Sequence, residues 1–444
     1  MEDYDEKPAF SSFLPGIAGL YGKPMWLFYV NRGQGVATLG TESKDYPILE
    51  FNAANKAYQL TPLIGFRTFV QGSRDGQEFF VEPFDPATSA DDGSKKVKRV
   101  MYIGTNEMEI KELDMKHNLM TNVTYIILPE EDFSSVVRRT TITNTDASTS
   151  VTLSVMDGLS KIEPVGGALD WMLKNMGRTL EGWFGVYHAD DTLTMPFFRM
   201  STEPSDSASV VIEKAGHYVL SFIEGGDETH KLLPIVYDAK KVFGQCSSLI
   251  TAEGLHKKSI KDILKEPQYG DAKTSSAFSA VEEITLGPGE SFTMVSFYGK
   301  TDNVKNVPEI AKTITQPGYV TKKYQAARDL ADDLTSSVAT ETADHLFNGA
   351  VKQMFLDNAL RGGLPIMLGG VDDAAIASNM DEDSRVKVFH AFSRIHGDLE
   401  RDYNQFVIVP TFFSQVGFQM HFIFAFLDYA HLLRFAVSGS WKLP

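Results

Sequence analysis

The sequence predicts a multidomain protein of the α+β class, in which a large antiparallel β-region comes first and helices follow. Three observations lead to this prediction. The chain has 444 residues, more than one domain usually contains. Short apolar or alternating runs closed by turn residues fill residues 26–299, as in a sandwich or barrel. Beyond residue 303 the apolar residues recur three and four apart, which is typical of helices.

Strands are predicted in the first region from runs of apolar or alternating residues. The runs cover residues 26–30, 123–128, 134–142, 150–156 and 218–223. Turn chemistry at Gly287-Pro-Gly289 predicts a hairpin that leads into a last strand ending at Tyr298. In the segments 138–145 and 151–155, one face is apolar and the other carries Thr or Arg.

Two helical patterns follow the β-region. Residues 324–334 place their apolar side chains on one helical face, and residues 345–360 continue the same spacing. The pair Gly362-Gly363 and the following Pro365 are expected to end the second helix.

Composition excludes several classes of partner. The chain has 42 Lys and Arg residues against 58 Asp and Glu residues, a formal charge of −16, which argues against nucleic-acid binding. The single Cys246 excludes an internal disulfide framework. The acidic N-terminal segment lacks the features of a signal peptide, and the apolar C-terminal segment is too short and too charged for a membrane helix. We therefore expect a cytoplasmic protein without membrane contact.

The densest group of polar side chains lies in residues 389–404. Two interpretations are equally open, a ligand site or a solvated charged helix with pairs four residues apart, and Gly397 favours the site because it permits a bend. A second cluster ends with Arg361 and two glycines, for which an ordinary helix C-cap is the simpler interpretation. The sequence contains no phosphate-loop, dinucleotide or H-E-x-x-H motif, and its histidines lack a metal-ligand spacing, so no metal site is expected.

Seven segments, in a fixed order, carry a likeness to a known family: residues 8–19, 22–34, 48–58, 65–69, 101–110, 357–365 and 389–404. Together they resemble the N-terminal part of inverting glycoside phosphorylases of the cellobiose phosphorylase-like group, closest to the β-1,3-glucan (laminarin oligosaccharide) phosphorylases. The likeness extends over residues 8–415.

The resemblance implies a division of the chain. Residues 8–300 would form an antiparallel β-supersandwich, residues 301–344 a helical linker, and residues 345–415 the beginning of an (α/α)-barrel catalytic domain. Residues 416–444 depart from the family pattern and are expected to form a divergent apolar tail. This order agrees with the β-region and the helices inferred from the residues alone.

The resemblance also implies a reaction, the reversible phosphorolysis of β-glucan oligosaccharides to α-glucose 1-phosphate. Inorganic phosphate is the co-substrate, no other cofactor is implied, and the family's enzymes are often homodimers. In an inverting scheme phosphate replaces the water and its base, so a single carboxylic acid protonates the leaving oxygen.

No residue of this chain matches the general acid of the family, so the catalytic residue is unknown and the isolated chain is expected to be inactive. Residues at the opening of the expected barrel are the candidates for sugar or phosphate binding. They are Arg361, Arg394, His396, Asp398, Arg401 and Asp402.

A different class of function stays open, a non-catalytic carbohydrate-binding or interaction module. In that case aromatic side chains of the sandwich, namely Trp26, Tyr58, Trp171 and Trp183, would stack on sugars. Core packing is the favoured interpretation of the tryptophans.

Overall fold

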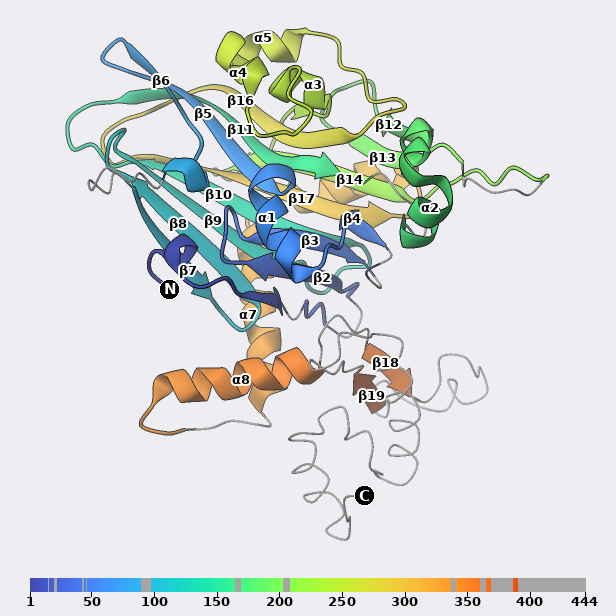
Figure 1. The fold of residues 1–444 in the computed structure, drawn as a ribbon. Coiled ribbons are helices and arrows are strands. Elements are labelled where there is room, and N and C mark those ends of the chain that lie inside the picture. Colours follow the sequence, from blue (N-terminus) through green and yellow to red (C-terminus); the bar gives the residue numbers. More distant parts are fainter. Residues whose placement is uncertain are drawn as a thin grey trace.

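A computed structural model of the chain describes residues 1–14, 16–19, 22–41, 44, 46–88, 97–163, 169–202, 208–336, 341–359, 365–368 and 386–389. Antiparallel sheets dominate this part of the chain, and helices lie on the outside of the sheets (Figure 1). No helix among the described residues is both long enough and apolar enough to span a membrane.

The largest sheet has eight strands in the order β12-β13-β14-β17-β10-β9-β8-β7, and every neighbouring pair is antiparallel. Its strands are β7 (Val97–Ile103), β8 (Glu107–Asp114), β9 (Leu119–Ile127), β10 (Ser134–Asn144), β12 (Phe184–His188), β13 (Pro196–Met200), β14 (Gly216–Glu224) and β17 (Ser291–Thr301).

A five-stranded sheet, in the order β15-β16-β11-β5-β6, forms the opposing layer of a β-sandwich. It consists of β5 (Phe66–Arg74), β6 (Gln77–Val81), β11 (Val151–Ile162), β15 (Ile235–Val236) and β16 (Ser275–Leu286). The turn after β16 contains Gly289, whose φ of 74° is in the left-handed region that favours glycine, and β17 follows it as predicted. The predicted hairpin is wrong, because β16 pairs with β11 and β15 whereas β17 pairs with β10 and β14, so the turn connects the two layers of the sandwich.

A third sheet of four strands comes from the N-terminal part of the chain. Its strands, in the order β1-β2-β3-β4, are β1 (Ser11–Leu14), β2 (Met25–Val30), β3 (Val36–Thr41) and β4 (Pro47–Leu49). Every residue of β2 and β3 is buried. One face joins an apolar core shared by all three sheets, and Phe28, Val30 and Ala37 on these strands pack in a second cluster with Ala57. Helix α1 (Ala54–Ile64) then connects β4 to β5.

Short helices cover the outer face of the five-stranded sheet. The helices α3 (Ala239–Phe243), α4 (Glu253–Lys257) and α5 (Ile260–Lys265) bury Phe243, Leu255 and Ile263 against Phe69 and Phe278 of the sheet. The connection between β11 and β12 contains α2 (Leu169–Met176) and the 3-10 helix η3 (Gly177–Trp183), and further 3-10 turns are η1 (Tyr4–Glu6) and η2 (Pro86–Thr88).

The outer face of the eight-stranded sheet is covered by helices that follow β17. A 3-10 turn, η4 (Val304–Asn306), leads into α6 (Val307–Ile314) and then α7 (Tyr319–Thr335). Helix α6 buries Val307, Ile310 and Ile314, whose spacing of three and four residues places them on one face against the sheet. Helix α7 is fixed on β8 and β9 by an Arg328–Glu107 ion pair of 3.0 Å and a bond from the Asn106 amide to the Ala327 carbonyl.

The largest charged group in the sandwich interior is Arg138 of β10, which is fully buried together with Asp157 of β11. Its guanidinium donates to both Asp157 carboxylate oxygens, at 2.9 and 2.6 Å, and to the Gln34 side-chain carbonyl at 2.5 Å. The hydroxyls of Thr68 and Thr140 also donate to Asp157. We call these five residues the Arg138 cluster. The Thr- and Arg-bearing positions Arg138 and Thr140 therefore face inward between two sheets.

Helix α8 (His345–Ala359) corresponds to the helix predicted for residues 345–360, and a two-stranded sheet of β18 (Pro365–Leu368) and β19 (Val386–Phe389) follows. The β-sandwich of the expected fold class is present. The described residues do not show the beginning of an (α/α) barrel, so that part stays a prediction.

Candidate functional site

The residues that the sequence assigns to sugar or phosphate binding all lie outside the described residues. They are Arg361, Arg394, His396, Asp398, Arg401 and Asp402. Their spatial arrangement stays a prediction, and the site that the structure does describe lies elsewhere.

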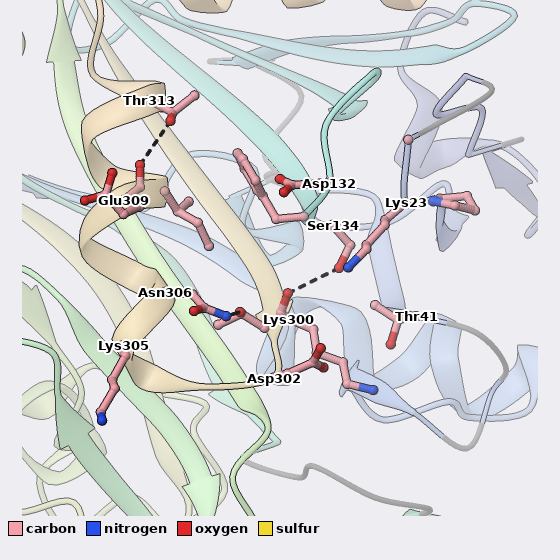
Figure 2. Close-up of a pocket in the computed structure, with 15 residues that line it drawn as sticks. Lys23, Thr41, Asp132, Ser134, Lys300, Asp302, Lys305, Asn306, Glu309 and Thr313 are labelled. Atoms are coloured by element: carbon pink, nitrogen blue, oxygen red, sulfur yellow. Dashed lines mark hydrogen bonds between the residues drawn. The ribbon is translucent and has the colours of Figure 1, made fainter.

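A cavity of about 810 Å³ lies where α6 meets the ends of several strands (Figure 2). One wall comes from the segment before β2, the end of β3 and the start of β10, and the opposite wall comes from η4 and α6. The Lys23 amide donates to the Glu131 carbonyl at 3.2 Å, and Ser134 pairs with Lys300 across β10 and β17. We call this space the α6 cavity; its volume is within the range of about 300–1,000 Å³ usual for ligand pockets.

Charged side chains of both signs surround the α6 cavity. Lys23 and Asp132 lie on the wall formed by the strands, and Asp302 lies at its lower end in Figure 2. Within the described part of the chain, none of these three side chains forms an ion pair. Lys305 and Glu309 also belong to the lining, on the wall formed by η4 and α6 (Figure 2). The cavity therefore presents ammonium and carboxylate groups that remain available to a ligand.

Several contacts fix the walls of the α6 cavity. The Asn306 amide donates to the Thr301 hydroxyl at 3.0 Å, and the Lys300 ammonium lies over the Tyr46 ring, 5.0 Å from its centroid. Thr41 is only 5% exposed, and its hydroxyl has no hydrogen-bond partner among the described residues. Leaving a buried hydroxyl without a partner costs free energy, and Thr41 is also one of the residues that line the cavity.

A second cavity, of about 580 Å³, lies between β6, β8 and α4, but its acidic side chains are already engaged. Glu82 pairs with Arg67 at 2.5 Å, and Glu112 pairs with Arg99 at 2.7 Å. Burial raises the pKa of both Glu82 and Glu112, and the arginine partners oppose this shift. The Arg67 guanidinium also donates to the Ile250 carbonyl at 3.1 Å, so these charges connect the sheet to the loop before α4.

The aromatic side chains expected to stack on sugars give a mixed result. Trp26 is 5% exposed, its ring packs edge-on against Phe51, and its indole N–H donates to the Thr41 carbonyl, which matches the favoured core interpretation. Tyr58 lies beneath the Arg32 guanidinium. The Trp171 side chain is outside the described residues, and Trp183 is half-buried at the end of η3.

The sequence did not single out the residues of the α6 cavity. Lys23, Asp132 and Asn306 are separated by more than a hundred residues and become neighbours only through the pairing of β10 with β17 and the docking of α6. The only signal near them was the segment 22–34, which contributed to the family resemblance without any role for Lys23.

No protein-family model matches this chain, and no curated protein matches it. A bacterial glucoamylase in complex with acarbose aligns with a TM-score of 0.35 and 10% identity, over 80% of this chain and 41% of its own. A galactose mutarotase-like protein from Clostridium acetobutylicum aligns with a TM-score of 0.35 and 10% identity, over 68% of this chain and 98% of its own.

A polysaccharide lyase aligns with a TM-score of 0.33 and 9% identity over 65% of this chain. The chain spans 34% of the length of the lyase and 41% of that of the glucoamylase. Because all three TM-scores are below 0.5, these likenesses carry no argument about what this chain binds or does.

Proposed function

We propose that this chain is the N-terminal part of an inverting glycoside phosphorylase that acts on β-glucan oligosaccharides and inorganic phosphate. The observation that carries the proposal is the order of seven motif segments between residues 8 and 404. The antiparallel sandwich followed by the helices α6 and α7 supports it, because this is the order of parts that the resemblance implies.

Phosphorolysis needs cationic groups that hold phosphate and carboxyl groups that contact the sugar. Phosphate attacks the anomeric carbon while a carboxylic acid protonates the leaving oxygen, so an anion must be held close to a sugar that gains positive charge. Arg361 and Arg394 are suited to hold the phosphate, because guanidinium groups form paired hydrogen bonds with its oxygens. Asp398 and Asp402 are suited to the sugar hydroxyls. No residue of this chain matches the general acid of the family, so we propose that the isolated chain binds ligands without turnover.

The proposal is tested with the purified chain, inorganic phosphate, and either laminaribiose or cellobiose. We expect no glucose 1-phosphate above the buffer control. We also expect inorganic phosphate to raise the melting temperature, and the variants Arg361→Met and Arg394→Met to lose this increase, because bound ligand stabilises only the folded state. A Lys305→Met variant, which removes an exposed cation outside the proposed phosphate site, is the matched control.

Two results would contradict the proposal. Robust release of glucose 1-phosphate would show that the chain contains a working proton donor. A melting temperature insensitive to phosphate, or equally sensitive in all variants, would remove the phosphate site on which the phosphorylase assignment depends.

A second candidate function is a non-catalytic carbohydrate-binding module. The α6 cavity favours it, because this space is built entirely from the sandwich and the helices that follow it. The two candidates differ in their response to phosphate: a binding module takes up an oligosaccharide with equal affinity whether or not phosphate is present.

A further inference from the structure

We propose that the α6 cavity is a binding site for a neutral oligosaccharide. The choice of β-linked glucose units rests on the proposed function. The choice of a neutral ligand with many hydroxyls rests on the cavity itself, through the signs of its charges, their lack of partners and the size of the space.

The mixed charge of the cavity selects against ionic ligands. An anion drawn to Lys23 would also face the carboxylates of Asp132 and Asp302, and a cation drawn to those carboxylates would face Lys23. A sugar hydroxyl both donates and accepts, so it satisfies a carboxylate and an ammonium group with the same atom. Hydrogen bonds to charged groups are stronger than those between neutral groups. A neutral sugar can therefore use all three side chains.

The remaining lining of the cavity suits the same ligand. Ile310 and Phe133 also line the cavity, although only 5% and 8% of their surfaces are exposed, so the apolar part of the lining is small. The hydroxyls of Ser134 and Thr313 and the amide of Asn306 add polar atoms on both walls. The Thr41 hydroxyl is buried at this wall and lacks a partner in the described part of the chain. At about 810 Å³, the space accommodates a short oligosaccharide.

A ligand in this cavity would connect parts of the chain that are otherwise held mainly by apolar packing. One wall belongs to the strands and carries Lys23 and Asp132, whereas Asn306 lies where η4 enters α6. A bound sugar that contacts both walls would fix α6 on the eight-stranded sheet. Sugar binding should therefore also slow hydrogen exchange in α6, which is a signature that binding elsewhere would not give.

Calorimetry with laminaritriose and cellotriose, without phosphate, tests the inference. We expect Asp132→Asn and Lys23→Met to weaken binding about tenfold each, because each removes a hydrogen bond to a charged group. The matched controls are Asp262→Asn and Lys257→Met, which make the same substitutions on exposed side chains that do not line the cavity. These controls should bind within about twofold of the unmodified chain.

The outcomes separate this inference from the proposed function. If the sugar binds but neither Asp132→Asn nor Lys23→Met lowers its affinity, the cavity is not the site. The proposed function is then still decided by whether phosphate raises the melting temperature and whether Arg394→Met loses this increase. If maltotriose binds in place of the β-linked sugars and the cavity variants lose it, the cavity is a sugar site and the β-glucan assignment is wrong. If inorganic phosphate binds and Asp132→Asn strengthens it, the cavity is an anion site and the inference is overturned. The inference is likewise overturned if no sugar binds.

Discussion

The Arg138 cluster and the α6 cavity contain the same kinds of charged side chain in opposite surroundings. Arg138 and Asp157 are fully buried, and each is surrounded by hydrogen-bonding partners from other strands. In the α6 cavity, Lys23 and Asp132 are exposed and have no ion-pair partner among the described residues. The partners that a charged group already has therefore indicate whether it serves the structure or a ligand, and residue type alone does not distinguish the two roles.

The largest effect is expected from breaking the Arg138 cluster. Asp157→Leu leaves the Arg138 guanidinium buried without its counter-charge, so we expect the free energy of unfolding to fall by about 3–5 kcal/mol. Urea denaturation of the purified chain measures this change. The double variant Arg138→Met/Asp157→Leu should regain part of the loss, because no unpaired charge stays buried, whereas the hydroxyls of Thr68 and Thr140 still lack their acceptor. A single variant as stable as the original chain would show that these charges are not coupled.

A smaller effect is expected from the ion pair that lines the second cavity. Arg67→Met leaves the Glu82 carboxylate and the carbonyls of Leu249 and Ile250 without their donor, so we expect a loss of about 2–4 kcal/mol. Hydrogen exchange should accelerate first in the loop before α4, because the guanidinium holds that loop on β5. Uniform acceleration throughout the sandwich would contradict this local role. Lys257→Met, which removes an exposed i,i+4 pair on α4, is the control and should change little.

The sequence predicted the layers of the fold better than it predicted the two charged regions. Strands such as β2 and β14, and the helix α7, follow from local apolar spacing, which a single segment contains. The alternation in β10 was also recognised, yet it could not show that Arg138 and Thr140 are on the interior face with Val136. That placement depends on Asp157, which comes from a strand in the opposing sheet.

The α6 cavity escaped prediction for the same reason. Its walls come from chain segments near residues 23, 41, 133, 300 and 309, and no local spacing connects them. The six candidate binding residues between 361 and 402 came from a family resemblance and lie outside the described residues, so the phosphate experiment remains their test.

A pH-dependent effect is expected from His217 of β14, which is buried and pairs with Lys300 of β17. Burial lowers the pKa of His217 to about 3, from an ordinary value of 6.5, and its ring is within 2.5 Å of the Glu163 carbonyl. Between these two pKa values, His217 is protonated in the unfolded chain but stays neutral in the folded chain. Stability is therefore full above pH 6.5 and is lost as the pH falls toward 3, with a slope of at most about 1.4 kcal/mol per pH unit.

Urea denaturation at several pH values measures this slope. Because carboxylates also titrate in acid, the informative quantity is the difference between the original chain and His217→Gln, which cannot take up the proton. That difference should change steadily between pH 6 and 4 and be constant above pH 7, as expected for a group with these two pKa values. The control is His230→Gln, because His230 lies in the loop after β14 and its ring stacks on Phe222. A pH-independent difference would show that His217 is protonated equally in both states.

The smallest effect on stability is expected from Lys23 and Asp132 of the α6 cavity, whose substitution should have the largest effect on oligosaccharide binding. Asp132→Asn and Lys23→Met remove exposed charges without ion-pair partners in the described part of the chain, so the free energy of unfolding should change by less than about 0.5 kcal/mol. The same variants are expected to weaken oligosaccharide binding, whereas variants of the Arg138 cluster destabilise the fold while leaving the cavity walls chemically intact. If Asp132→Asn instead destabilises the chain as strongly as Asp157→Leu, then Asp132 belongs to the structural charges, and its availability to a ligand would have to be rejected.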